Sequence, residues 1–123
     1  MDVTATLSLG DPLEPARKAT AQMLQERERT FSLPQPFYCD ERLFDIDMQE
    51  IFQKEWLIAG MTCEIPTKGN YITLQIGKNP IIVIRGADGV VHAFHNVCRH
   101  RGSRLCTSDK GKVAKLVCHY HQW

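Results

Sequence analysis

Two pairs of cysteine and histidine residues have types and spacing that suit metal binding. Cys98 and His100 are separated by one residue, and Cys118 and His121 by two, with the 17 residues 101–117 between the pairs. Thiolates and imidazoles are the donors that proteins use for zinc, iron and iron–sulfur clusters. The pattern therefore predicts a metal centre with two thiolate and two imidazole ligands.

This donor set fits a [2Fe–2S] centre of the Rieske type, in which two histidines replace two cysteines on one of the irons. A neutral imidazole donates less charge than a thiolate, so the histidine-bound iron is easier to reduce. Such a centre carries one electron, and the motif therefore predicts redox chemistry. Gly102 and Ser103 are small, which would let backbone N–H groups approach the cluster sulfides, where hydrogen bonds raise the potential.

A structural zinc site with closed tetrahedral coordination is an alternative for the same four residues. The single residue between Cys98 and His100 is unusual for zinc, because pairs of cysteines or pairs of histidines predominate in such sites. Four unrelated residues are a further alternative, although two Cys/His pairs in strand-end loops would rarely arise by chance. Cys106 lies between the pairs and could add a ligand, but the set of four is complete without it.

The elements that position these residues are predicted to be short antiparallel strands. The turn sequence Asp88-Gly89 lies between apolar runs, which is a strong local signal for a hairpin. The first ligand loop follows the strand after this turn, and another short strand leads directly to Cys118. The metal centre is therefore expected at one tip of a small antiparallel β-sandwich. Apolar runs bounded by turn signals predict strands over 56–62, 71–76, 81–85, 90–94 and 113–117.

Residues 1–36 lack the strand pattern of the later sequence and are predicted to form an N-terminal extension. Pro12 and Pro15 precede a helix predicted over 16–29, and Leu33-Pro34-Gln35-Pro36 indicates an extended linker. We read the charged residues of this helix, including Arg17, as a solvated face. The chain is thus divided into an extension, 1–36, and a mainly β domain, 37–123.

A second helix is predicted over 45–56, at the start of the β domain. Asp47 and Glu50 have the spacing of a capping box, with Asp in place of Ser or Thr. Phe52 and Trp56 recur at helical spacing on its apolar face, so we expect both to be core anchors.

Composition and charge bound the function further. The hydrophobic fraction of 43% and charged fraction of 24% are those of an ordinary globular domain, and a formal net charge of +1 gives no reason to expect nucleic acid or an anionic membrane as a partner. The start, Met1 to Thr4, lacks a basic segment and an apolar run, so we expect no secretory signal. Cys39, Cys63 and Cys106 have no regular spacing, which favours reduced thiols in a cytoplasmic protein, with Cys63 as a small core residue.

The sequence around the ligands resembles the two Rieske boxes of the α (oxygenase) subunits of aromatic-ring-hydroxylating oxygenases. The likeness covers about residues 37–123, and His119 departs from it, because the family often has proline there. Within the family, the N-terminal stretch is most similar to the branch that oxidatively demethylates quaternary ammonium compounds, glycine betaine in particular. The resemblance lies in Asn96-Val97-Cys98-Arg99-His100-Arg101-Gly102, Cys118-x-Tyr120-His121-Gln122-Trp123, Phe52-x3-Trp56, Ile65-Pro66-x2-Gly69-x-Tyr71 and Arg85-x3-Gly89-x-Val91-x-Ala93-Phe94.

The resemblance implies a [2Fe–2S] cluster and an oxygenase that uses O2 and electrons from NAD(P)H. It also implies a second, larger domain that follows residue 123 and holds a mononuclear non-haem Fe(II), so no catalytic residue is expected in 1–123 and the sheet is expected to be completed beyond Trp123. A separate NAD(P)H-dependent reductase and a homotrimer are the implied partners, with His121 facing the neighbouring subunit. The residues expected around the ligands are Arg99, Arg101, Gly102, Ser103, Tyr120 and Trp123.

Two other classes of Rieske protein differ from this sequence, one at individual positions and the other in its N-terminal extension. The respiratory-complex group would carry a disulfide at positions 103 and 120, which here are Ser103 and Tyr120, and tends to have a hydroxyl residue where Trp123 stands. Both differences predict an oxygenase-type cluster of low potential. A free-standing Rieske ferredoxin, an electron carrier without catalysis, is the alternative function, although such proteins lack an extension like residues 1–55.

Overall fold

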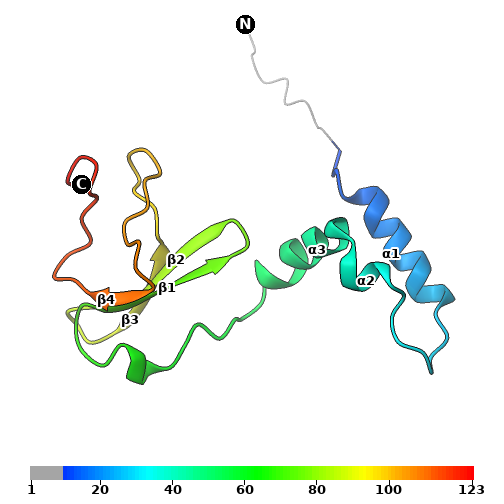
Figure 1. Ribbon diagram of the computed structural model, residues 1–123, viewed down its shortest axis with the longest axis horizontal. Helices are drawn as coiled ribbons and strands as arrows, with labels where there is room; N and C mark the ends of the chain where they lie inside the picture. Colours follow the sequence, from blue (N-terminus) through cyan, green and yellow to red (C-terminus); the bar gives the residue numbers. More distant parts are fainter. Residues whose placement is uncertain (1–9) are drawn as a thin grey trace, which may run out of the picture. The chain divides into compact units, whose positions relative to one another are not determined.

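Residues 10–123 are described by the computed structural model, and their backbone divides into two units with the boundary between Trp56 and Leu57 (Figure 1). The first unit is helical and the second is built on a sheet. The expectation that Met1 to Thr4 begins no secretory signal concerns residues outside the described range. Within that range, no helix is both long enough and apolar enough to cross a membrane.

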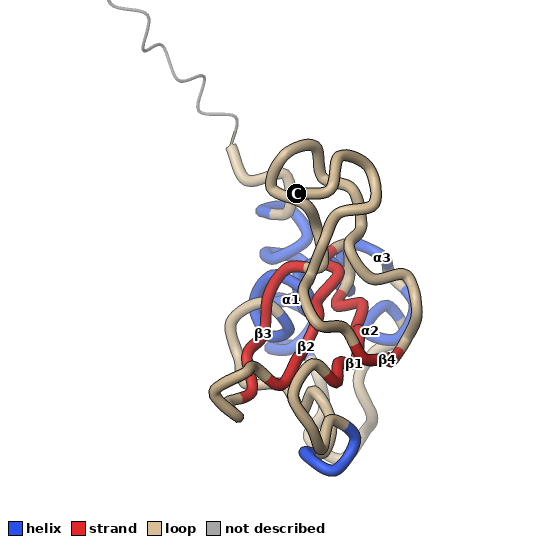
Figure 2. The backbone as a smooth tube through the Cα atoms, turned by 90° about the vertical axis from the view of Figure 1, so that its left-hand side faces the viewer, coloured by secondary structure: helices blue, strands red, loops and turns tan. Residues whose placement is uncertain are grey.

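Four strands of the second unit form one antiparallel sheet in the order β3-β2-β1-β4 (Figure 2). Ile72 pairs with Val83 across β1 and β2, and Ile82 pairs with Phe94 across β2 and β3. The predicted antiparallel β fold with an N-terminal helical extension is confirmed. The strands are β1 (Asn70–Ile76), β2 (Asn79–Arg85), β3 (Val91–His95) and β4 (Lys110–Lys112).

The sheet has an apolar cluster on each face, because neighbouring residues of a strand point to opposite sides. Ile72 and Val83 pack on one face with Ile65, which follows the short 3₁₀ turn η2 (Thr62–Glu64). Tyr71 and Ile82 pack on the other face with Cys106. The second cluster includes a residue from the segment between the two ligand pairs, and it therefore anchors the loops that carry them.

Two predicted strands are wrong. Residues 113–117 do not join the sheet, and the fourth strand lies earlier, at Lys110–Lys112. Its central Gly111 fits against the ring of Tyr71, where an added Cβ would lie 2.7 Å from the phenol oxygen. A polar strand that requires glycine lacks the apolar pattern used for prediction. The apolar run 56–62 is also not a strand, and it leads irregularly into η2.

The helical unit contains α1 (Glu14–Glu26), α2 (Pro36–Cys39) and α3 (Glu41–Asp47), which continues as a π-helical turn, η1 (Met48–Phe52). The first predicted helix is confirmed, about two residues earlier than expected. The second begins before the predicted start, because the Asp40 side chain accepts the backbone N–H of Arg42 and caps α3. The predicted capping box at Asp47 is therefore wrong, since Asp47 lies inside the helical run.

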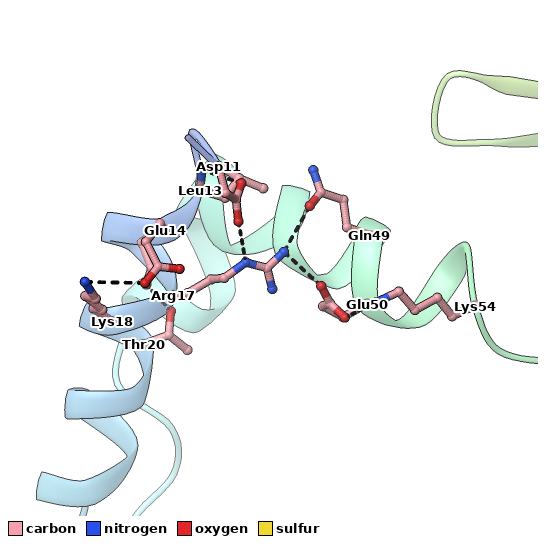
Figure 3. Close-up of polar contacts among 10 residues, drawn as sticks. Asp11, Leu13, Glu14, Arg17, Lys18, Thr20, Gln49, Glu50 and Lys54 are labelled. Carbon is pink, nitrogen blue, oxygen red and sulfur yellow. Dashed lines mark hydrogen bonds and ion pairs between the residues drawn. The ribbon is translucent and has the colours of Figure 1, made fainter. Parts of the chain in front are cut away.

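Arg17 joins α1 to the π-helical turn and is not part of a solvated face, contrary to the prediction (Figure 3). Its guanidinium donates to the Asp11 carboxylate at 3.0 Å and to the side-chain oxygens of Glu50 at 2.8 Å and Gln49 at 3.0 Å. Glu50 also pairs with Lys54. The Arg17 guanidinium thus connects Asp11, which precedes α1, to Gln49 and Glu50 of η1.

Three side chains expected in the core are exposed. Trp56 is fully exposed, at 101% of its reference area, and Phe52 is 42% exposed. The run that follows Trp56 forms no strand, so it does not carry this side chain onto a face of the sheet. Cys63, predicted as a small core residue, is also exposed because it lies in the turn η2.

Candidate metal centre

The first ligand loop is a tight turn that begins directly after β3. The Cys98 N–H donates to the Ser103 carbonyl at 2.7 Å, and the Gly102 N–H donates back to the Cys98 carbonyl at 2.9 Å. Gly102 has φ +70°, a left-handed conformation that glycine adopts without steric cost. The turn therefore brings both ends of the Cys98–Ser103 segment together with His100 between them.

The second ligand loop repeats this backbone pattern. The Cys118 N–H donates to the Trp123 carbonyl at 2.7 Å, and the Gln122 N–H donates back to the Cys118 carbonyl at 2.9 Å. Gln122 has φ +60°, in the place that Gly102 takes in the first loop. Each loop thus starts with a cysteine and closes through a left-handed residue four positions later.

The two loops stand side by side at one end of the sheet, as both backbone views show (Figures 1 and 2). Their donors form two pairs. Cys98 and Cys118 are buried, at 7% and 2% exposed, and the Cys98 thiol is among the neighbours that lower the pKa of Cys118. The imidazoles of His100 and His121 are exposed, with ring centroids 4.9 Å apart. The site therefore has a buried sulfur side and a solvent-facing imidazole side.

The surroundings of Cys118 favour its thiolate. The Tyr120 N–H donates to the sulfur and, with smaller contributions from the Cys98 thiol, the His121 N–H and the Ser103 hydroxyl, lowers the pKa of Cys118, although burial opposes the shift. A thiolate is the form that binds metal. Ser103 thus links the first loop to the cysteine of the second.

The other residues expected around the ligands divide into two groups. The ring of Tyr120 lies against His121, with centroids 4.1 Å apart, and Trp123 stacks on His100 at 4.9 Å with planes 10° apart. Arg99 and Arg101 are exposed. The predicted surrounding residues therefore include two aromatic rings that contact the imidazoles and two arginines that face solvent.

Two further residues near the loops differ from the ligands in their surroundings. Asn96 is completely buried and hydrogen-bonds to Cys106, a role that the sequence analysis missed although Asn96 stands at a strand end just before the first ligand. Cys106 itself lies in the apolar cluster with Tyr71. Burial raises the pKa of its thiol, which suits a core residue rather than a ligand.

The arrangement of the four donors determines which metal group they fit. Within residues 10–123, no three Cys, His, Asp or Glu side chains converge to hold one ion. The donors instead meet as a sulfur pair and an imidazole pair, and a two-iron cluster with two cysteines on one iron and two histidines on the other requires two such pairs. The residues therefore fit a [2Fe–2S] group.

A comparison with protein families decides between the candidate centres. Residues 55–123 match the family model described as the Rieske [2Fe-2S] domain. The chain belongs to the Rieske [2Fe-2S] domain family. This match supports the Rieske interpretation over a structural zinc module, and the matched region contains both ligand loops.

Relatives of this Rieske chain are oxygenase subunits. It is 84% identical over all 123 residues to the glycine betaine monooxygenase oxygenase subunit of Pseudomonas aeruginosa (strain UCBPP-PA14), and it spans 29% of that protein's length. Naphthalene 1,2-dioxygenase from Rhodococcus sp. has a TM-score of 0.78 with 27% identity, covering 89% of this chain and 25% of that one.

A second solved structure shares more sequence with the chain than the naphthalene dioxygenase does. The structure of a quaternary ammonium Rieske monooxygenase has a TM-score of 0.69 with 37% identity, covering 73% of this chain and 25% of that one. These relatives are oxygenases, which supports an oxygenase component over a free-standing ferredoxin.

Proposed function

We propose that the chain is the electron-transfer portion of a Rieske oxygenase component that hydroxylates or oxidatively demethylates a small organic substrate, using O2 and electrons from NAD(P)H. The observation that carries the proposal is the pairing of the donors, a buried sulfur pair and an exposed imidazole pair on two equivalent loops. The proposed ligands are Cys98, His100, Cys118 and His121. When bound, the cluster accepts and releases one electron at a time.

The surrounding residues have separate tasks in this proposal. The Tyr120 N–H and the Ser103 hydroxyl donate to the sulfur of Cys118, which stabilises the negative charge of the thiolate ligand. Trp123 and Tyr120 fix the planes of the two imidazoles. Arg99 and Arg101 place positive charge near an anionic group and remain available to a partner surface.

The proposed domain arrangement extends beyond the present residues. Residues 1–36 are an extension and 37–123 the Rieske domain, in which residues 37–54 lead into the region that the family model matches. A catalytic domain with a mononuclear non-haem iron is proposed to follow residue 123, supported by the relative of which the chain spans 29%. Glycine betaine is the proposed substrate, because the same relative is a glycine betaine monooxygenase subunit.

The proposed partners are an NAD(P)H-dependent reductase and two further copies of the full-length subunit. One of the related structures concerns inter-subunit electron transfer in a quaternary ammonium Rieske monooxygenase. In the present chain, the imidazoles of His100 and His121 are exposed, so electrons could leave or enter on this side. We propose that His121 faces the neighbouring subunit. A cytoplasmic location is supported by Cys39, Cys63 and Cys106, the three cysteines outside the proposed ligand set, which form no disulfide.

The test of the cluster is the purification of the full-length protein without oxygen. We expect two irons and two acid-labile sulfides per chain, and a reduced form with a Rieske electron paramagnetic resonance (EPR) spectrum. Stoichiometric zinc with no labile sulfide would contradict the proposal.

The test of the reaction needs the full-length protein with its reductase and glycine betaine. Removal of an N-methyl group by one O2 and two electrons should release formaldehyde in proportion to the NAD(P)H consumed. NAD(P)H oxidation that leaves glycine betaine unchanged would rule out this substrate without affecting the cluster proposal.

A further inference from the structure

We propose that Asn96 is a positioning residue for the metal centre, whose buried amide pairs with the backbone of Cys106 and thereby sets the spacing of the two ligand loops. The proposal rests on the ligand set proposed above. It assigns a specific task to a residue that lies two positions before Cys98 but binds no metal itself.

The pairing is bidentate. The Asn96 Nδ2 donates to the Cys106 carbonyl at 2.7 Å, and the Cys106 N–H donates to the Asn96 Oδ1 at 2.8 Å. The Asn96 side chain is 0% exposed. Its own N–H donates to the Pro80 carbonyl of β2 at 2.8 Å, so the residue is held by the sheet on one side and holds the loop on the other.

A primary amide is well suited to this pair. It offers one donor and one acceptor side by side, which matches the N–H and C=O of a peptide unit. A carboxylate has no hydrogen to give to the Cys106 carbonyl, and an apolar side chain serves neither group. Because the site is buried, an unmatched peptide group would not be compensated by water.

The pair closes the base of the first loop. The loop runs from Val97 to Arg104, which form an isolated antiparallel bridge, and Cys98 is tied to Ser103 inside it. Asn96 and Cys106 are the residues at the two ends of this segment. The Asn96 amide thus joins the Val97–Arg104 bridge in setting the position of Cys98 and His100 relative to the sheet.

The same pair connects the first loop to the second. The Cys106 side chain belongs to the apolar cluster with Tyr71 and Ile82, and Leu116 packs against that cluster. Leu116 lies two residues before Cys118. A continuous path thus leads from Asn96 through Cys106 to Leu116, and a shift at Asn96 should change the separation of the sulfur pair and of the imidazole pair.

The test uses the full-length holoprotein with Asn96→Asp, which keeps the size of the side chain and, as a carboxylate, removes the donor. Asn96→Leu, which removes the donor and the acceptor together, is measured beside it, because a buried acid that stays protonated could still donate its O–H. Loss of a direct hydrogen-bond partner of a metal ligand weakens metal binding by about 10- to 100-fold, and Asn96 acts one step further away, so a smaller effect is expected. We expect iron to pass to a chelator faster than in the wild type, by about two- to ten-fold, below the loss for a direct partner of a ligand, and the g-values of the reduced cluster to change. The matched control is Asn79→Asp at the start of β2, a half-buried position whose side chain has no hydrogen bond among the described residues. The control should behave like the wild type.

A purely structural role would have a different outcome. Asn96→Asp protein that melts earlier, but whose cluster has wild-type g-values and a wild-type iron-release rate below the transition, overturns the proposal. If Asn96→Asp does not fold, Asn96→Ser decides by the same two measurements, since a hydroxyl is too short to serve both groups of Cys106. A wild-type protein without labile sulfide would overturn the cluster itself, which is a separate result.

Discussion

The indole of Trp123 lies stacked on the imidazole of His100, with ring centroids 4.9 Å apart and planes 10° apart. The two residues belong to different ligand loops, so each loop orients a side chain of the other. His121 meets the same imidazole edge-on at 4.9 Å. Stacked aromatic pairs contribute about 0.5–1.5 kcal/mol beyond the area that they bury. The ring of Trp123 therefore restricts the plane of a proposed iron ligand.

Removing this ring should loosen the imidazole side of the site. In the full-length holoprotein, we expect Trp123→Ala to broaden the EPR spectrum of the reduced cluster and to speed iron release by about 10-fold, the lower end of the effect of losing an outer partner. Trp123→Phe keeps a stacking ring and should remain close to the wild type. Equal spectra and release rates in all three proteins would show that the stacking has no influence on His100.

Substitution should distinguish the two proposed ligand cysteines, Cys98 and Cys118, from the core residue Cys106. Cys98→Ser and Cys118→Ser each remove a buried thiolate donor, so we expect them to abolish the visible absorbance of the cluster. Cys106→Ser should leave the absorbance intact, because the pairing with Asn96 uses only the backbone of Cys106. Iron and sulfide analysis of the three full-length variants provides the measurement, and loss of the cluster in Cys106→Ser would add a role for this thiol.

The Arg17 cluster should make the helical unit sensitive to acid. The Leu13 N–H and then the Arg17 guanidinium lower the pKa of Asp11, and Lys54 followed by Arg17 lowers the pKa of Glu50. Carboxylates with lowered pKa values stabilise the folded state at neutral pH. This contribution is lost as the pH falls below about 4, through the pKa values of the folded protein.

We therefore expect Arg17→Gln to lower the Tm of the full-length protein slightly at pH 7 and to have a smaller effect at pH 3.5. Lys18→Gln is the control, since among residues 10–123 the ion pair of Lys18 is with exposed Glu14 on the same helix. Thermal unfolding followed by circular dichroism measures both variants. A loss of Tm in Arg17→Gln that is the same at both pH values would exclude the carboxylates as its cause.

The central strands could be predicted, and the ligands proposed, because each has a local signal. The spacing of Cys98, His100, Cys118 and His121 is a property of the sequence alone, and β1 to β3 follow apolar runs bounded by turn residues. The capping of α3 by Asp40 was missed, because Asp47 and Glu50 offered a more familiar pattern nearby. Local signals of similar strength compete, and only packing selects one of them.

Other features depend on residues that meet only in the folded chain. β4 forms at Lys110–Lys112 because Gly111 fits the ring of Tyr71, a relation that hydrophobic alternation does not encode. The stacking of Trp123 on His100 requires both loops to be in place. The bidentate pair of Asn96 with Cys106 likewise joins the two ends of a loop, so the sequence shows only an asparagine before a cysteine.

Residues 1–123 expressed alone should be prone to aggregation. β3 is an outer strand of the sheet, and Phe94 on it is 51% exposed. Open strand edges with apolar side chains pair readily with other chains. We expect low solubility, weak retention of the cluster and no oxygenase turnover, and Phe94→Lys should reduce the aggregation seen by light scattering. A monodisperse protein with full cluster occupancy would contradict this expectation.

The reduction potential should lie near the low end of the Rieske range of about −150 to +300 mV. Positions 103 and 120 carry serine and tyrosine, so no disulfide can link the loops there, and position 123 carries an indole in place of a hydroxyl donor. Fewer hydrogen bonds then offset the charge of the reduced cluster, which disfavours reduction. A low potential suits a centre that is reduced by an NAD(P)H-dependent partner and passes its electron to an oxygen-activating iron.

Substitution at position 123 tests this cause directly. Trp123→Ser and Trp123→Ala both remove the ring that stacks on His100, and they differ only by a hydroxyl. We expect the serine variant to have the higher potential of the two, by tens of millivolts, since hydrogen bonds to the cluster raise its potential. Redox titration of the full-length proteins at neutral pH gives the answer. Equal potentials in the two variants would remove the hydroxyl from the explanation, and a wild-type midpoint well above zero would show that the argument from the missing disulfide and hydroxyl is wrong.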